Sequence, residues 1–205
     1  MNQLVQASAS LPPTIRPGPQ ALNRTNSAAS VSRTASHDAA YWIGLAEQKC
    51  VPSFSYKVIV STQTITNAGA SAVPDQKPVS MTYSPDRGLR LDATTGNASF
   101  SVDVASVLRK MSGKTPWTIE REESLDAEPT VCVSSSNERL SVKVWIRLDD
   151  GAVLQFEQSI EGKQIASCKL VYTSVNGTLV PEKVTTVFPA TGRTMIQDYR
   201  SYVVN

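Results

Sequence analysis

Apolar and polar positions alternate along residues 140–205 in five runs that four short turns separate. The runs are rich in Val, Ile, Thr, Tyr and Phe, residues that favour β-strands. Each turn contains a glycine, which adopts the positive φ of a hairpin loop without strain. The pattern therefore predicts an antiparallel meander. Its turns are Asp149-Asp150-Gly151, Glu161-Gly162-Lys163, Val175-Asn176-Gly177 and Ala190-Thr191-Gly192.

Burial predicts the register of the first hairpin. A three-residue loop that ends in a left-handed Gly151 sets Ile146 opposite Leu154 and Val144 opposite Phe156. A loop one residue shorter would set polar residues opposite these apolar ones, so the three-residue loop is favoured.

The same comparison at the second turn adds four residues to this apolar face, namely Ala166, Cys168, Leu170 and Tyr172. At the third turn, Asn176-Gly177 alone favours a two-residue turn, whereas side-chain matching favours three residues. Both registers stay open, and so does the face that the last two strands share.

Two helices are expected upstream of the meander. Asp38 is a helix cap, and the helix runs to about Lys49 with Tyr41, Trp42, Leu45 and Ala46 on one side. Ser101 caps the second helix, whose apolar positions are Val104, Val107, Leu108 and Met111. We interpret it as a helix laid on the sheet rather than a movable lid. Further strands are expected at 54–66, 79–83, 89–94, 117–124 and 130–135, with a loop at 67–77.

Composition separates a tail from the domain. Residues 1–37 hold three arginines, four prolines and no acidic residue, without hydrophobic periodicity. They are expected to be a disordered tail or linker, and residues 38–205 a single domain. That domain carries 17 basic and 18 acidic residues, which argues against a nucleic-acid surface. No apolar run is long enough to cross a membrane.

The start of the chain leaves the targeting signal open. Residues 4–9 are similar to the end of a secretory signal, with small Ala7 and Ala9, but the basic start and apolar centre of such a signal are missing. Either a signal begins upstream or the match is chance. The arginine-rich, acid-free composition also fits an organellar transit peptide, although the prolines oppose its amphipathic helix.

Catalytic and metal chemistry is disfavoured by the inventory of side chains. The one histidine, His37, ends the predicted tail, so neither a Ser-His-Asp triad nor a histidine metal site is expected in the domain. No cofactor is expected either. The acidic run from Glu120 to Glu128 is interpreted as a solvated face rather than an acid/base pair. Three cysteines, Cys50, Cys132 and Cys168, fit no metal spacing; either two of them form a long-range disulfide or all three are buried thiols.

Four segments carry a resemblance to a known family. They are PSFSYKV at 52–58, MTYSPDRGLRL at 81–91, RLSVKVWIRLDDGAVLQF at 139–156, and NGTLVP at 176–181 with the following residues to DYR at 198–200. The order of a helix, a strand pair, a short helix and a meander, together with these segments, resembles the periplasmic lipoprotein-carrier superfamily over residues 38–205. One departure is Ser84, where the family has the arginine that fastens its lid; the nearby Arg87 is a candidate substitute.

The resemblance implies a mainly β (α+β) fold, in which the antiparallel meander curves into a half-open β-barrel covered by two short helices. It also implies a non-catalytic periplasmic or secreted protein whose apolar concave cavity holds lipid or lipoprotein acyl chains. The alternative is a structural or protein-interaction domain of the cell envelope with a packed core, binding an envelope protein and no ligand. The expected ligand-binding residues are Val144, Ile146, Leu154, Phe156, Leu170, Tyr172, Leu108 and Met111.

Overall fold

The structure of the chain is a computed structural model that describes residues 37–66, 73–92, 107–108 and 116–205, with side chains from residue 78 in the second of these ranges. All of them belong to one of the two compact units of the chain, Ser32–Asn205. The predicted tail, apart from His37, lies outside the described residues, so its disorder stays a prediction.

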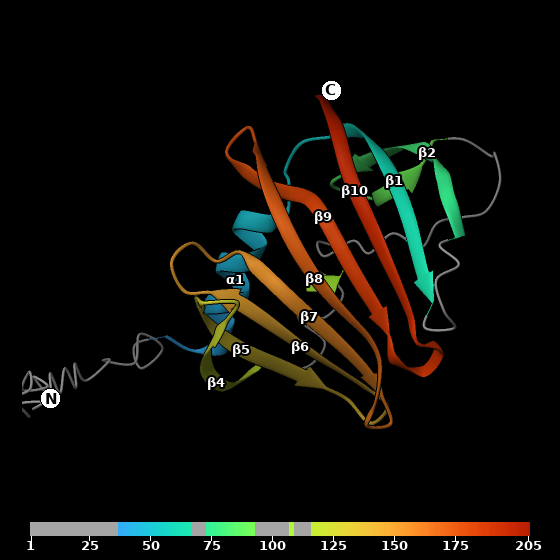
Figure 1. Cartoon of the computed structure of the whole chain (residues 1–205). Coiled ribbons are helices and arrows are strands. Elements are labelled where there is room, and N and C mark those ends of the chain that lie inside the picture. Colours follow the sequence, from blue (N-terminus) through green and yellow to red (C-terminus); the bar gives the residue numbers. More distant parts are fainter. Residues whose placement is uncertain (1–36, 67–72, 93–106, 109–115) are drawn as a thin grey trace, which may run out of the picture. The chain divides into compact units, whose positions relative to one another are not determined.

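The described residues form a single antiparallel sheet of ten strands, together with the helix α1 (Figure 1). The strands are β1 (Tyr56–Thr66), β2 (Val73–Ser84), β3 (Gly88–Leu91), β4 (Thr118–Leu125), β5 (Glu128–Ser136), β6 (Leu140–Arg147), β7 (Val153–Ile160), β8 (Lys163–Val175), β9 (Thr178–Phe188) and β10 (Arg193–Val204). Their order is β3-β2-β1-β10-β9-β8-β7-β6-β5-β4. Since β3 and β4 remain as edges, the sheet is not closed into a barrel. The loop expected at 67–77 ends earlier than predicted, because β2 already begins at Val73.

Helix α1 (Ala39–Cys50) begins where the sequence predicted. The carboxylate of Asp38 accepts a hydrogen bond of 2.8 Å from the backbone N–H of Tyr41, which satisfies one of the free donors of the first turn. The predicted grouping of Tyr41 on one side with Trp42 and Ala46 is wrong, because Tyr41 is 44% exposed while the other two residues are buried. Its ring instead stacks on His37, with centroids 3.7 Å apart. The buried side of the helix consists of Ala39, Trp42, Ile43, Ala46 and Cys50.

The first hairpin confirms the left-handed Gly151, with φ of 79°, but corrects the loop length. Arg147 N–H donates to the carbonyl of Ala152, and Gly151 N–H donates back to the carbonyl of Arg147, so four residues lie in the loop. Val144 pairs with Phe156 as predicted. The predicted pairing of Ile146 with Leu154 is wrong, because a shift of register sets Ile146 opposite Val153.

The second and third turns each contain two residues at positive φ, Glu161-Gly162 and Asn176-Gly177. The second turn is therefore one residue shorter than the three-residue loop expected. In each of these two strand pairs, the register shifts by one residue a few positions away from the turn. Beyond the shift, the alignment is the one that a three-residue loop would give. Cys168 thus lies opposite Phe156, as predicted. At the third turn, the two-residue alternative is correct for the turn itself, and the three-residue alignment is correct for the body of the sheet.

One face of the sheet, called the inner face below, packs against α1 and contains the hydrophobic core. The core cluster draws on α1, β1, β2 and the strands from β5 to β10. Of the second predicted helix, the structure describes Val107 and Leu108; both are helical, and Leu108 is fully buried in the cluster. The rest of that helix lies outside the described residues. One covering helix is therefore present, and the second is described only at these two positions.

Candidate binding face

Most of the predicted ligand-binding residues meet on the inner face. Those within the core cluster are at most 5% exposed: Val144, Ile146, Phe156, Leu170 and Leu108. They come from β6, β7, β8 and the segment around 107–108, so the alternation of each strand brings them together. Tyr172 is half-buried and packs against the same cluster.

Two predicted residues do not join this group. Leu154 is half-buried and does not belong to the core cluster among the described residues. The irregular register near the turn is the physical reason, since it places Val153 instead of Leu154 opposite Ile146. Met111 lies outside the described residues.

Helix α1 approaches the β6–β7 hairpin very closely at Gly151. A Cβ added to Gly151 would lie 2.5 Å from Cγ of Leu45 and 3.3 Å from its backbone carbon. Glycine is therefore needed here for close approach as well as for its backbone angle. Nearby, the hydroxyl of Tyr172 donates a 2.8 Å hydrogen bond to the carbonyl of Val153. Burial raises the pKa of Tyr172, so its hydroxyl stays protonated and keeps this bond.

The inner face also contains buried polar residues that the sequence analysis missed. They are Thr62 and Thr64 on β1, Thr186 on β9 and Gln197 on β10, each at most 8% exposed. The hydroxyl of Thr186 lies 3.4 Å from the sulfur of Cys168. The period of two in β1 could have revealed the threonines, because Thr62 and Thr64 continue the buried positions Val58 and Val60.

Four buried polar atoms lack a hydrogen-bond partner among the described part of the chain. They are Nε1 of Trp42, Nε1 of Trp117, Oγ1 of Thr62 and Nε2 of Gln197. Thr62 and Gln197 are directly paired across β1 and β10, so both side chains stand on the inner face. Unpaired groups of this kind are rare in protein interiors and require an explanation.

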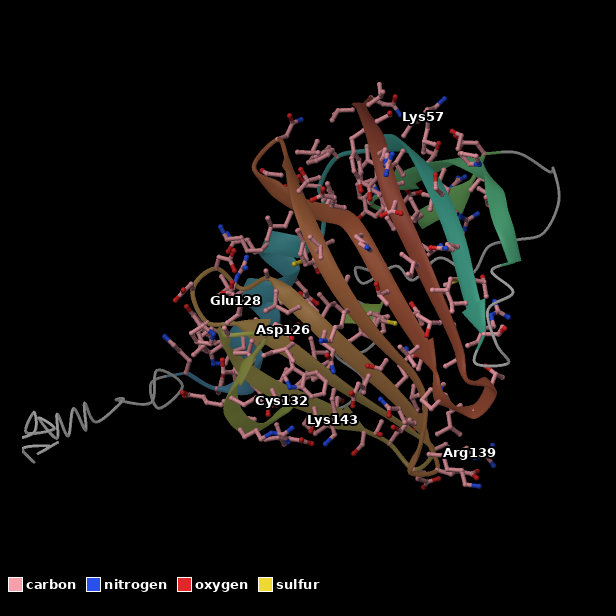
Figure 2. All side chains as sticks on the ribbon, viewed as in Figure 1. Lys57, Asp126, Glu128, Cys132, Arg139 and Lys143 are labelled. Carbon is pink, nitrogen blue, oxygen red and sulfur yellow. The ribbon has the colours of Figure 1, made fainter. Side chains whose placement is uncertain are left out.

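Two acidic residues of β4, Glu120 and Glu123, are held in ion pairs on the outer face. Glu120 pairs with Lys143 at 2.7 Å, and Glu123 pairs with Arg121 at 2.9 Å. These contacts lower the pKa of both carboxyls, chiefly through the hydrogen bond from the basic partner. A lowered pKa keeps a carboxyl ionised at neutral pH, which is unsuited to a general acid. Asp126, labelled with Lys143 in Figure 2, lies at the β4–β5 turn and pairs with Lys169.

All three cysteines are free and buried. Burial raises the pKa of Cys132 and of Cys168 to about 11, and it also raises the pKa of Cys50. Thiols of this kind are protonated at neutral pH and react slowly. Cys132 contacts the outer-face acids, its sulfur lying 3.9 Å from Glu120, whereas Cys50 and Cys168 belong to the core cluster. Of the two alternatives for the cysteines, buried thiols are observed.

The candidate lid residue Arg87 is placed on the surface. Its Nε lies 3.1 Å from the carboxylate of Asp86, and both side chains are more than two-thirds exposed. Within the described ranges, no group of three His, Cys, Asp or Glu side chains is arranged to hold a metal ion. No helix in the same part of the chain is long and apolar enough to cross a membrane.

Comparison with solved structures identifies the architecture. A LolA superfamily protein from Nitrosomonas europaea aligns over 82% of this chain and 94% of its own, with a TM-score of 0.58 and 14% identity. The chain has a LolA-like fold. A putative outer membrane lipoprotein-sorting protein domain from Vibrio parahaemolyticus aligns over 80% and 91% of the two chains, with a TM-score of 0.55 and 8% identity.

A DUF1329 family protein from Desulfovibrio piger gives the same TM-score of 0.55 at 10% identity, over 81% of this chain and 92% of the other. At such identities the likeness concerns the fold alone. No protein-family profile matches the sequence, and no curated protein matches it. The resemblance drawn from the sequence segments is thus confirmed at the level of the fold.

Proposed function

We propose that this chain is a non-catalytic protein of the periplasm or cell envelope that binds lipid or lipoprotein acyl chains on its inner face. The observation that carries the proposal is the single apolar face of an open ten-stranded sheet with α1 packed against it, in a LolA-like fold. An apolar face of this kind favours an apolar occupant by the hydrophobic effect, without requiring sequence-specific contacts. The finer architecture that we propose is a half-open barrel with the inner face concave.

The residues proposed to contact the acyl chain are the predicted ones that belong to the core cluster or pack against it. Phe156 and Leu170 lie on neighbouring strands, and Leu108 belongs to the same cluster. Leu154 is a weaker candidate because of its position outside that cluster. A lid cycle is not part of the proposal, since Ser84 replaces the family's arginine and Arg87 pairs with Asp86.

Titration with a fluorescent fatty-acid probe tests the proposal. The full chain, purified in detergent-free buffer after removal of co-purified lipid, should bind the probe saturably, and a non-fluorescent fatty acid should displace it. A protein that is folded by circular dichroism but leaves probe fluorescence unchanged would contradict the proposal. That result would favour the alternative, a packed interaction domain with an envelope protein as its partner.

A further inference from the structure

Thr62 and Gln197, whose donors lack a partner within the described ranges, lie side by side on the inner face. Thr62 is 5% exposed and Gln197 is fully buried. Along one row across the sheet, Gln197 pairs with Val184, and Val184 pairs with Leu170 of the proposed acyl-binding group. A polar pair therefore adjoins the apolar residues, on the same face of the same sheet.

Both groups offer hydrogen-bond donors. The carbonyl oxygen of the Gln197 side chain accepts from the hydroxyl of Tyr199 at 3.4 Å, which leaves the two hydrogens of Nε2 without a partner in the described residues. The hydroxyl of Thr62 is likewise unpartnered and does not bond to Gln197. Side chains directly opposite in an antiparallel pair have Cβ atoms about 5 Å apart, so one acceptor atom can reach both donors.

The surroundings indicate a neutral acceptor. The cross-strand and same-face neighbours whose side chains the structure describes are uncharged: Val60, Thr64, Val184, Met195 and Tyr199, each at most 8% exposed. Gln76, which pairs with Thr62 from β2, is an uncharged residue as well. A carboxylate or phosphate buried there would find no cationic partner among these neighbours, and an unpaired buried charge is strongly disfavoured. A carbonyl oxygen carries no such cost and accepts two hydrogen bonds.

We propose that Thr62 and Gln197 form a polar subsite that donates hydrogen bonds to the carbonyl oxygen of an acyl ester whose chain lies along the inner face. The proposal rests on the acyl-binding function proposed above and specifies what part of the ligand is recognised. In the protein without ligand, the two donors are left unsatisfied by the described side chains. The ester carbonyl satisfies both, so it discriminates an acyl chain from an alkyl chain of equal length.

Two ligands that differ only in the carbonyl test the subsite: 1-decanoyl glycerol, an ester, and 1-O-decyl glycerol, the matching ether. The full chain should bind the ester at least about ten-fold more tightly than the ether, because the two proposed hydrogen bonds together contribute at least that factor. Thr62→Val and Gln197→Met keep the approximate shape of each side chain and remove its donor. Each should reduce the preference, and the double variant should abolish it. Thr186→Val is the control, because the hydroxyl of Thr186 already has a partner in Cys168.

The outcomes separate the two proposals. Equal binding of ester and ether by the unaltered chain overturns the subsite but leaves acyl binding in place; that result would indicate that water satisfies the two donors. Binding of neither ligand by a folded chain overturns both. A preference that survives in a folded double variant also overturns the subsite. If the double variant fails to fold, the single variants Thr62→Val and Gln197→Met decide the question, and an undiminished preference in either folded variant overturns the proposed pair of donors.

Discussion

Replacing Gly151 with alanine should destabilise the protein in two separable ways. Gly151 has φ of 79°, a left-handed angle that costs a residue with a Cβ roughly 1–2 kcal/mol. The new Cβ would also lie 2.5 Å from Cγ of Leu45, an approach that forces the helix or the hairpin to move. Overpacking of this kind costs about 1–3 kcal/mol. The sum, about 2–5 kcal/mol, is a large part of the 5–15 kcal/mol that is roughly typical of a folded domain.

Gly162 provides a matched control. Its φ of 75° is nearly the same, but nothing lies within 4 Å of a Cβ built there. Gly162→Ala should therefore report the backbone strain alone. Thermal unfolding followed by circular dichroism measures both variants. For a domain of 150–250 residues, 1 kcal/mol shifts the melting temperature by about 2–4 °C, so Gly151→Ala should lower it by roughly 4–20 °C.

A double-mutant cycle with Leu45→Ala assigns the excess cost to the contact with α1. Removing the Leu45 side chain beyond Cβ should recover about 1 kcal/mol or more of the loss caused by Gly151→Ala, so the two changes are not additive. The reasoning is refuted if Gly151→Ala costs no more than Gly162→Ala. It is also refuted if the effects of Gly151→Ala and Leu45→Ala add.

Three further predictions concern the inner face, the tail and the thiols. If the inner face lines a cavity, Phe156→Glu should abolish fatty-acid probe binding while the protein stays folded. Unfolding of this variant, together with no probe binding by the unaltered chain, would instead indicate a packed core. Val171→Glu is the control, because Val171 on β8 is 53% exposed. Deleting residues 1–36 should leave the melting temperature within about a degree, and a fall of several degrees would show that the tail stabilises the domain. Because burial raises the pKa of Cys132 and Cys168 from 9.0 to about 11, the unfolded thiols ionise first. The unfolding free energy should then be unaffected by these thiols below pH 9 and should fall between about pH 9 and 11. A double Cys132→Ala and Cys168→Ala variant should show a weaker fall, and an equal fall would contradict the assignment.

Local signals in the sequence were sufficient for α1, for the strands of the meander and for most of the faces of these strands. The cap at Asp38, the left-handed Gly151 and the pairing of Val144 with Phe156 each follow from chemistry within a few residues. Glycine at a turn and alternation along a strand are strong signals because few residues fit positive φ and because side chains alternate between faces. These signals predicted the meander correctly.

Register near the turns could not be obtained in the same way. Bulges after the second and third turns, and the irregular pairing at Ile146, shift the alignment by one residue without a marked change in composition. Leu154 was misplaced for this reason. Tyr41 was misplaced because tertiary packing buries the side of the helix that contains Trp42, Ile43 and Ala46, and Tyr41 lies outside that side. The pairing of β1 with β10, which brings Thr62 beside Gln197, joins distant parts of the chain and has no local signal.

Native mass spectrometry of the full chain, purified gently from bacterial cells without added detergent, tests acyl binding most directly. We expect a population of protein ions heavier than the chain by the mass of one lipid or acyl-bearing molecule, which collisional activation releases and lipid extraction identifies. The population should diminish in Phe156→Glu and persist in Val171→Glu. Ions of the bare chain alone, from a folded protein that also fails to bind added fatty acid, would contradict the proposed function.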